Sequence, residues 1–433
     1  MAALSTVDVA APGRNTAAAS RPLRGWLAHR ALRAMLAVYL VALRVAPAIG
    51  RRRRPLSPGG CDILVTGTFY ADNWVRSHLH PLSRSSECRR IRVVSTYPVP
   101  PIDKVEVVAP PRWLVRTAGS VGARLATFAW VAVRSRPDVV AGFHLLLNGL
   151  AAALVARLSG ARAAYFCVGG PAETAGGGLY GDNRLFAMLP AEDAVIEQRL
   201  HAAIDAFDFA IAMGSGAVRY YREQGIRTPF YIVAGGIDGR RFEQTETPPT
   251  VDVVFTGRLA PVKRVDLLLR AFARVRESLP GVTAVIVGDG ELRRELEQLS
   301  ADLGLSAAVS FVGHQKDVAA WLTRAKVFVL PSDSEGLSLA LMEAMRCGLP
   351  AVVSRTGDLD DLVEDGVNGY LVSARTPDAF AEPIAALLAD ADRRTRFGAA
   401  ARRAAGRYDV EPVARLWDGI LAHERQAAAG EQR

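Results

Sequence analysis

Residues 327–347 read Val-Phe-Val-Leu-Pro-Ser-Asp-Ser-Glu-Gly-Leu-Ser-Leu-Ala-Leu-Met-Glu-Ala-Met-Arg-Cys. The first four residues predict a buried strand, the Pro-Ser pair a tight turn, and the residues beyond the glycine a helix. Glu335 then lies at the strand exit and Glu343 about two turns into the helix. Ligands of an open α/β sheet bind outside the carboxyl ends of its strands. Two carboxylates at that place favour a polar, polyhydroxylated ligand.

The rest of the chain has the composition of a folded protein of two or three domains. It has 433 residues, of which 50% are hydrophobic and 22% charged. The net charge of +9 comes from residues 1–60, which hold ten arginines and one acid, Asp8, so that the remainder is neutral. A nucleic-acid-binding protein more often spreads its basic residues across a folded face, and we expect no such partner.

The basic N-terminal segment predicts an arm with an amphipathic helix. Residues 1–22 are expected to be disordered, and residues 23–49 to be helical. Arg33 and Arg44 argue against a helix that crosses a bilayer. We therefore expect an interfacial helix on an anionic membrane, with the Arg51–Arg54 run as its polybasic end. The alternatives are a helix packed on the protein body with solvated arginines, or a signal peptide.

Four cysteines offer neither C-x-x-C spacing nor an accompanying pair of histidines: Cys61, Cys88, Cys167 and Cys347. Three of them lie in or beside apolar runs. We expect buried, reduced thiols in a cytoplasmic protein, without a zinc site or a disulfide framework.

From residue 61 onward, short apolar strands alternate with glycine-rich turns and helices, as in doubly wound parallel sheets. The pattern runs from 61 to 235 and again from 251 to 405. Residues 236–250 contain Thr-Glu-Thr-Pro-Pro-Thr and predict a linker. We expect two Rossmann-like domains that face a cleft, the first for an acceptor and the second for a nucleotide. Residues 406–433 are expected to form a helix that returns to the first domain.

Gly257-Arg258-Leu-Ala-Pro-Val-Lys263 lies between a predicted strand and a predicted helix. The glycine permits a sharp turn, Arg258 offers a planar fork of donors, and Lys263 a compact charge. A helix N-terminus also favours anions, so this turn is suited to a diphosphate. The alternative is two solvated charges. The chain has only four lysines, which favours a specific role for Lys263.

Five motifs together, in order and spacing, resemble the retaining glycosyltransferases of family 4, which have the GT-B fold. They are Gly257-Arg258-x4-Lys263, Gly288-Asp-Gly290, Glu335-x7-Glu343 after a Pro-Ser strand exit, Gly348-Leu-Pro-Ala-Val, and Asn368-Gly-Tyr-Leu-Val. The resemblance is strong over 251–405, weaker over 61–233 and absent before residue 60.

The resemblance implies a role for each motif. Arg258 and Lys263 are expected to stabilise the donor diphosphate, Glu343 to bind the ribose, and Glu335 to face the sugar hydroxyls. Backbone groups are expected to contact the donor at Gly67, Gly257, Gly288, Gly290, Gly336, Leu337 and Ser338, and His314 to line the base. The family needs no metal, and a UDP- or GDP-sugar serves as donor.

One departure from the family concerns a histidine near the reacting carbon. The family often has it in a turn that corresponds here to Phe166-Cys-Val-Gly-Gly-Pro171, which has none. His144 is the nearest substitute, and a hydrogen-bonded structural role is its alternative. Gly169 and Gly170 are expected to be approached closely by a ligand, and Glu173 to contact acceptor or donor.

The sequence thus predicts a retaining glycosyltransferase that uses a nucleotide-diphosphate sugar. Its expected acceptor is a lipid-linked or cell-envelope polysaccharide precursor, and its expected place is the inner face of the cell membrane. Two alternatives remain: a nucleotide-sugar epimerase of the same fold, and a non-catalytic GT-B scaffold protein.

Overall fold

The computed structural model describes residues 22–69, 71–180, 191–243 and 248–430. Contacts divide them into two units. The N-terminal domain consists of the described residues up to Arg240 together with those from Gly406 onward, and the C-terminal domain of Arg241–Ala405. The disorder expected for residues 1–22 falls outside the described residues, except for Pro22, which begins the first helix.

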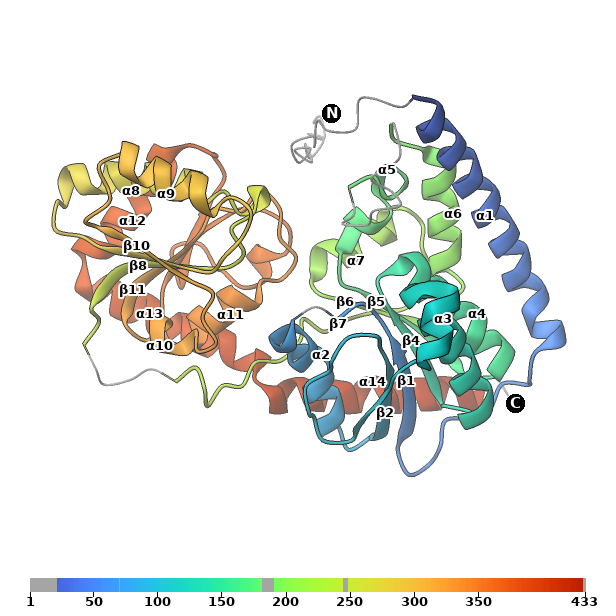
Figure 1. The fold of residues 1–433 in the computed structure, drawn as a ribbon. Coiled ribbons are helices and arrows are strands. Elements are labelled where there is room, and N and C mark those ends of the chain that lie inside the picture. The colour runs from blue at the N-terminus through green and yellow to red at the C-terminus, as the bar shows by residue number, and fades with distance from the viewer. Residues whose placement is uncertain (1–21, 70, 181–190, 244–247, 431–433) are drawn as a thin grey trace, which may run out of the picture. The chain divides into compact units, whose positions relative to one another are not determined.

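The N-terminal domain is built on a parallel sheet of seven strands among the described residues, in the order β3-β2-β1-β4-β5-β6-β7 (Figure 1). Every residue of β1, β4 and β5 is buried, which explains their nearly unbroken apolar sequences. The strands are β1 (Cys61–Thr66), β2 (Cys88–Val94), β3 (Val105–Val108), β4 (Val139–Phe143), β5 (Arg162–Cys167), β6 (Phe209–Ala212) and β7 (Phe230–Ile232).

Helices cover this sheet in two groups. On one side α2 packs against α14, and on the other α4 contacts both α1 and α3, while α1 also contacts α6. The main helices are α1 (Pro22–Ile49), α2 (Asp72–Arg84), α3 (Arg112–Ser135), α4 (Leu150–Ser159), α6 (Ala194–Ile204), α7 (Ser215–Glu223) and α14 (Val410–Gly430). Shorter turns are η2 (Leu145–Gly149), η3 (Gly170–Glu173) and α5 (Ala175–Gly178).

The predicted helix at 23–49 is confirmed as α1, and one of its faces packs on the domain. Leu36 is fully buried in the same apolar cluster as Leu150 and Leu200. Arg33 Nε lies 2.7 Å from Asp193 Oδ2, and the Tyr39 hydroxyl donates to the Leu150 carbonyl at 2.8 Å. The packed alternative therefore holds for this face. The opposite face is exposed, as Val38 and Ile49 are 70% and 75% accessible.

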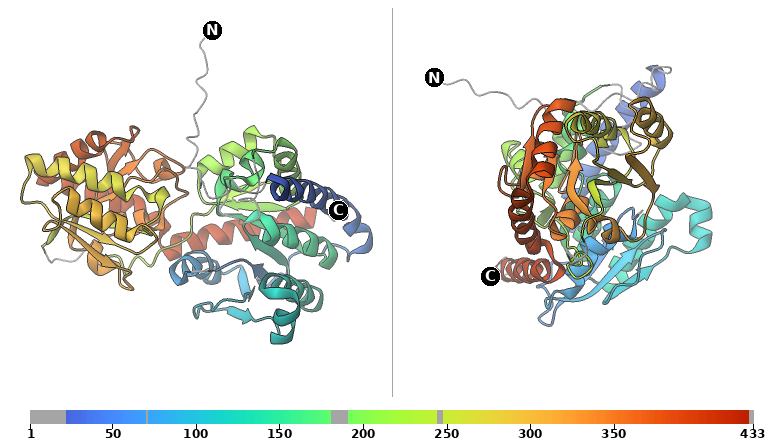
Figure 2. Two further views of the ribbon diagram at one scale, coloured as in Figure 1. Left: turned by 45° about the horizontal axis from the view of Figure 1, so that its top comes forward. Right: turned by 90° about the vertical axis from the view of Figure 1, so that its left-hand side faces the viewer.

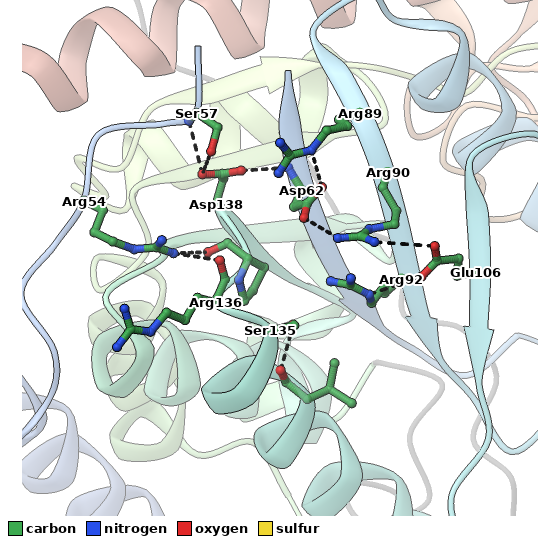
Figure 3. A network of polar contacts seen from close by, with 12 residues as sticks. Arg54, Ser57, Asp62, Arg89, Arg90, Arg92, Glu106, Ser135, Arg136 and Asp138 are labelled. Carbon is green, nitrogen blue, oxygen red and sulfur yellow. Dashed lines mark hydrogen bonds and ion pairs between the residues drawn. The ribbon is translucent and has the colours of Figure 1, made fainter. Parts of the chain in front are cut away.

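The arginine run after α1 also bonds to the domain. Arg53 pairs with Asp208 at 2.6 Å, and Arg54 donates to the Arg136 carbonyl at 2.7 Å. Nearby, the Asp138 carboxylate accepts hydrogen bonds from Ser57 and from the Asp62 amide (Figure 3). Arg51 also donates to the Val133 carbonyl at 3.2 Å. These contacts fasten the segment to the domain near the amino-terminal ends of the strands, so three of the four arginines act as structural ties.

The C-terminal domain repeats the architecture with six parallel strands among the described residues, in the order β10-β9-β8-β11-β12-β13. They are β8 (Val251–Thr256), β9 (Ala284–Val287), β10 (Val309–Gly313), β11 (Ala325–Leu330), β12 (Ala351–Ser354) and β13 (Gly369–Val372). Its helices are α8 (Val265–Ser278), α9 (Arg293–Asp302), α10 (Ala319–Leu322), α11 (Leu339–Arg346), α12 (Pro377–Ala389) and α13 (Ala391–Ala405), with the turns η5 (Pro261–Lys263) and η6 (Leu359–Asp361).

The last helix, α14, packs with the N-terminal domain. After the short turn η7 (Gly406–Tyr408), it lies along α2 (Figures 1 and 2). Its Glu424 is buried and lies 2.8 Å from Arg162 of β5. All four cysteines are buried, and none forms a disulfide, as predicted.

Candidate functional site

An ion pair joins the two sequence motifs of the C-terminal domain. Lys263 Nζ lies 2.5 Å from Glu335 Oε1, and the Ser332 hydroxyl donates to the same oxygen at 2.6 Å. The Glu335 side chain is only 8% exposed. Residue 357 must be glycine, because its φ is +57° and a Cβ there would overlap the Glu335 carbonyl. The exit of β11 thus packs between the turn that carries Lys263 and the turn at Gly357.

Arg258 follows β8 and reaches into solvent. Its side chain is 67% exposed, and its guanidinium donates to Glu291 at 3.1 Å. Behind it, Gly257 and Gly288 pack backbone to backbone, since a Cβ on Gly288 would overlap the Gly257 carbonyl. The Gly257 amide also donates to Val287 at 3.0 Å. The glycines bring the ends of β8 and β9 together and leave the arginine fork accessible to an anion.

Arg264 is a residue whose role the sequence did not indicate. It adopts the left-handed conformation with φ of +48°, and its guanidinium donates to Asp333 and Asp266, each at 3.1 Å. The Asp333 amide in turn donates to the Val262 carbonyl at 2.9 Å. This ladder fixes the Lys263 turn beside the exit of β11. A positive φ at arginine depends on tertiary contacts, so no local pattern could have revealed it.

Glu343 is the fifth residue of α11, closer to the helix start than the two turns expected. Ser338 caps the helix, its hydroxyl accepting from the Leu341 amide at 3.4 Å. Among the described residues, none donates a hydrogen bond to the Glu343 carboxylate in the structure. Burial raises the pKa of Glu343 to about 7, although the Arg241 charge lowers it. A half-buried carboxylate of this kind is costly unless something binds it.

The remaining predicted donor contacts lie at neighbouring strand ends. A Cβ on Gly290 would overlap the Leu259 carbonyl, and the Leu259 amide donates to Asp289 at 2.9 Å. His314 directly follows β10 and is exposed. Before α11, Gly336 is exposed, whereas the side chains of Leu337 and Ser338 are buried.

In the N-terminal domain, His144 directly follows β4 and is held by Glu173. His144 has a φ of +62°, and its Nδ1 lies 3.3 Å from Glu173 Oε1. Glu173 is buried and accepts further hydrogen bonds from the amides of Leu145 and Gly169 and from the Tyr165 hydroxyl. The His144 charge and these backbone donors hold the pKa of Glu173 below its ordinary value, although burial raises it.

The environment of Glu173 revises two expectations. Its carboxylate is fully used inside the protein, which does not favour direct contact with acceptor or donor. The close approach at Gly169 also has an internal cause, because a Cβ there would lie 2.7 Å from Glu173 Cγ. Gly170 has a φ of +60° with open space around it. Gly169 is therefore explained by the space that Glu173 occupies, and Gly170 by its positive φ.

Gly67 directly follows β1, the neighbour of β4 in the sheet. A Cβ at Gly67 would lie 2.8 Å from the Phe69 ring, which explains the glycine by packing. The buried Arg124 of α3 donates to the Gly67 carbonyl. Gly67 and His144 thus lie at adjacent strand ends of the N-terminal domain, while Arg258, Lys263, Glu335 and Glu343 gather in the C-terminal domain.

Comparisons with known proteins place the strongest similarity in the C-terminal domain. Residues 239–404 match the family model described as Glycosyl transferases group 1. The chain is 38% identical over 195 residues to a D-inositol 3-phosphate glycosyltransferase of Geodermatophilus obscurus, covering 42% of this chain and 43% of that protein. It is 31% identical over 203 residues to a GDP-mannose-dependent alpha-(1-6)-phosphatidylinositol monomannoside mannosyltransferase of Mycolicibacterium smegmatis, covering 45% and 53%. The chain thus spans about half the length of such curated relatives.

Solved structures share the fold over most of the chain. Anabaena Alr3699/HepE in complex with UDP aligns with a TM-score of 0.65 at 19% identity, over 84% of this chain and 100% of that chain. The sucrose-phosphate synthase of Thermosynechococcus elongatus aligns with a TM-score of 0.68 at 18% identity, over 85% and 100%. The GT-B fold, two Rossmann-like domains with an N-terminal helix, is confirmed.

Proposed function

We propose that this chain is a retaining glycosyltransferase of family 4 that transfers a hexosyl group from a nucleotide-diphosphate sugar. The observation that carries the proposal is the donor constellation of the C-terminal domain. Two cations, Arg258 and Lys263, occupy one turn, and Lys263 is paired with Glu335 at 2.5 Å. Glu343 lies on α11, the helix that follows the exit of β11, and burial raises its pKa. The two cations match a diphosphate, Glu335 the hydroxyls of a sugar, and Glu343 those of a ribose.

The two cations are proposed to bind the diphosphate and to stabilise the charge that develops as the sugar leaves. Arg258 is accessible and offers a fork of donors, and Lys263 offers a point charge whose position is fixed by Glu335. Fixed cations aimed at a developing charge contribute a large part of an enzyme's rate acceleration. The amides before α11, at Gly336, Leu337 and Ser338, supply further donors.

Three other parts of the C-terminal domain bind the rest of the donor in this proposal. Glu343 accepts hydrogen bonds from the two ribose hydroxyls, and Glu335 from hydroxyls of the sugar. The turns at Gly288–Gly290 and His314 line the base. The donor is proposed to be a UDP- or GDP-sugar. Arg258 and Lys263 take the place that a metal ion has in other phosphate sites.

The N-terminal domain is proposed to bind the acceptor and to provide His144. Glu173 accepts from Nδ1 of His144 in this proposal, which leaves Nε2 for a hydroxyl of acceptor or sugar. The leaving phosphate takes the acceptor proton on the face from which it departs, so that the sugar retains its anomeric configuration. The turn at Gly67 supplies backbone contacts to phosphate.

The acceptor is proposed to be a lipid-linked or cell-envelope precursor at the inner face of the membrane, where α1 holds the protein peripherally. Val38, Val41 and Ile49 lie on the exposed face of α1. Residues 29–49 are also long and apolar enough, by length and composition alone, to cross a membrane. The buried Leu36 and the Arg33–Asp193 pair favour a helix that stays on the domain.

A triple variant, Val38→Ser/Val41→Ser/Ile49→Ser, tests the membrane contact without emptying the core beneath α1. We expect it to release the protein from anionic vesicles while its thermal unfolding stays unchanged. Deleting residues 1–58 is a poorer test, because that also removes Leu36 and the arginine ties. Vesicle binding equal to wild type would contradict the membrane proposal.

The transfer reaction is tested by thermal shift against UDP-, GDP- and ADP-sugars, followed by assay of the stabilising donor with glycolipid acceptors. A bound donor should raise the melting temperature, because it binds only the folded state. We expect a product with the donor's anomeric configuration. Interconversion of the free donor sugar without an acceptor would instead indicate an epimerase, and no donor binding at all a scaffold protein.

A further inference from the structure

The helix α3 carries a second exposed apolar surface in the N-terminal domain. Trp113 and Trp130 are 66% and 63% accessible, and Val121 and Val133 are also exposed. The other tryptophans whose side chains the structure describes are at least partly buried. Indole side chains are rarely left in water to this degree, and clustered exposed apolar groups mark surfaces that meet a partner.

A kink separates the start of α3 from its packed part. Gly119 has φ of +70° and ψ of 170°, which interrupts the helix. After the kink, Phe128 and Ala132 are fully buried in the domain core. Before it, residues 111–118 are exposed, apart from the half-buried Leu114 and Val115. In the right-hand view of Figure 2, the turquoise start of α3 extends away from the domain. This tip contributes little to the core, so folding does not explain its apolar residues.

The charge of α3 points to an anionic partner. No Asp or Glu occurs between Val107 and Pro137, whereas Arg112, Arg116 and Arg134 are exposed. The described residues of α1 share this character, with no acid and with exposed Arg30 and Arg44 beside their apolar face. The chain outside residues 1–60 is neutral, so an acid-free helix with exposed arginines is a local feature of the surface.

The two helices belong to the same layer of the domain. Both contact α4, which packs on β4 and β5, so α1 and α3 flank α4 on one side of the sheet (Figure 1). Both helices carry exposed apolar residues and arginines and no acids, so these features belong to one helical layer of the N-terminal domain.

We propose that α3, together with α1, seats the N-terminal domain on an anionic bilayer, with Trp113 and Trp130 in the headgroup region. Tryptophan favours the membrane interface because its ring is apolar and its N–H is polar. Exposed arginines add attraction to anionic lipids, while their stems rest on the apolar boundary. The proposal rests on the bilayer partner proposed for α1 and adds a second contact, and it is independent of the donor chemistry.

The test measures partition of the full chain onto vesicles of phosphatidylcholine with 30 mol% phosphatidylglycerol. We expect Trp113→Ala/Trp130→Ala to partition about tenfold more weakly than wild type. The matched control is Trp321→Phe in the C-terminal domain, which should bind like wild type. Both tryptophans are exposed, so the double variant should melt as wild type does. Equal partition of double variant and wild type would overturn the proposal.

Brominated lipids provide a second, independent readout. In variants whose only tryptophan is Trp113 or Trp130, with the other five replaced by phenylalanine, we expect the vesicles to quench its fluorescence, whereas Trp321 as the only tryptophan stays unquenched. Vesicle binding without quenching at 113 or 130 would mean that α1 alone holds the protein, which also overturns the proposal. Binding with no preference for the anionic lipid would overturn the role of the arginines. Loss of donor binding with vesicle binding retained would count against the transfer reaction alone.

Discussion

Two glutamates, one in each domain, have opposite surroundings. Glu173 of the N-terminal domain accepts hydrogen bonds from two amides and a tyrosine hydroxyl, and its pKa lies below the ordinary value. Glu343 of the C-terminal domain accepts none from any described residue, and burial raises its pKa to about 7. Glu173 is buried and Glu343 is half-buried, yet only Glu173 has replaced the hydrogen bonds that burial removes.

The difference separates a residue that holds the structure together from one whose carboxylate stays available for the ribose proposed above. A buried carboxylate with satisfied oxygens stabilises its neighbours and offers nothing to a substrate. An unsatisfied one lowers stability and keeps its acceptors available. The cations differ in exposure instead: Arg53 and Arg54 bond to the domain, whereas Arg258, although it pairs with Glu291, is 67% exposed beside a glycine turn.

The largest expected effect lies in the C-terminal domain. Lys263→Ala and Glu335→Ala should each lower transfer by at least about 10³-fold, because each removes one half of the pair that meets the diphosphate and the sugar. The control is Lys326→Ala. Lys326 pairs with Asp252 at 2.7 Å near the starts of β11 and β8, at the opposite end of these strands from Lys263 and Glu335. Wild-type turnover in either test variant, measured with the stabilising donor, would refute the assignment.

Removing the unsatisfied charge should stabilise the protein. The folded pKa of Glu343 is about 7 and its ordinary value 4.5, so wild-type stability is full below pH 4.5 and falls as the pH rises to 7. Glu343→Gln should therefore be more stable than wild type at pH 8, by up to about 3 kcal/mol, and equal to it at pH 4. Denaturant unfolding at both values checks this. A variant no more stable than wild type at pH 8 would remove the contrast between the two glutamates.

The opposite sign is expected for Glu173→Gln. Its folded pKa is lowered, so its stabilisation is present above the ordinary value of 4.5 and is lost as the pH falls through the folded pKa. The amide cannot accept from both backbone N–H groups and a hydroxyl, so stability at pH 7 should fall by about 2 kcal/mol. Glu173 also positions the proposed catalytic His144. Turnover of the variant should therefore fall together with its stability, while donor binding stays unchanged. A variant as stable as wild type would show that the hydrogen bonds of Glu173 do not hold the turns at His144 and Gly169.

Much of the fold was predictable because its signals are local. Buried parallel strands are short apolar runs, and their exits carry glycines, so the two doubly wound sheets and the helix at 23–49 could be inferred. The proposed donor residues have local signals for a related reason: Arg258 and Lys263 share one turn, and Glu335 and Glu343 follow one strand. Residues close in sequence at a strand exit stay close in space.

Interactions between distant residues could not be predicted. Arg53 and Asp208 are 155 positions apart, and the structural use of the arginine run follows from that pair. The positive φ of Arg264 likewise depends on a tertiary contact, since its guanidinium pairs with Asp333, 69 positions away. The helix α2 (Asp72–Arg84) was also missed, since it has a negative mean hydropathy and contains Pro81.

The central claim is that the C-terminal domain binds a nucleoside diphosphate through an unsatisfied Glu343. Calorimetric titration of UDP, GDP and ADP into wild type and Glu343→Gln at pH 8 tests it most directly. The account predicts that one of the three binds wild type, and that the variant, although at least as stable, binds it about tenfold more weakly. Equal affinity in the two proteins, or no binding to wild type, would contradict the account.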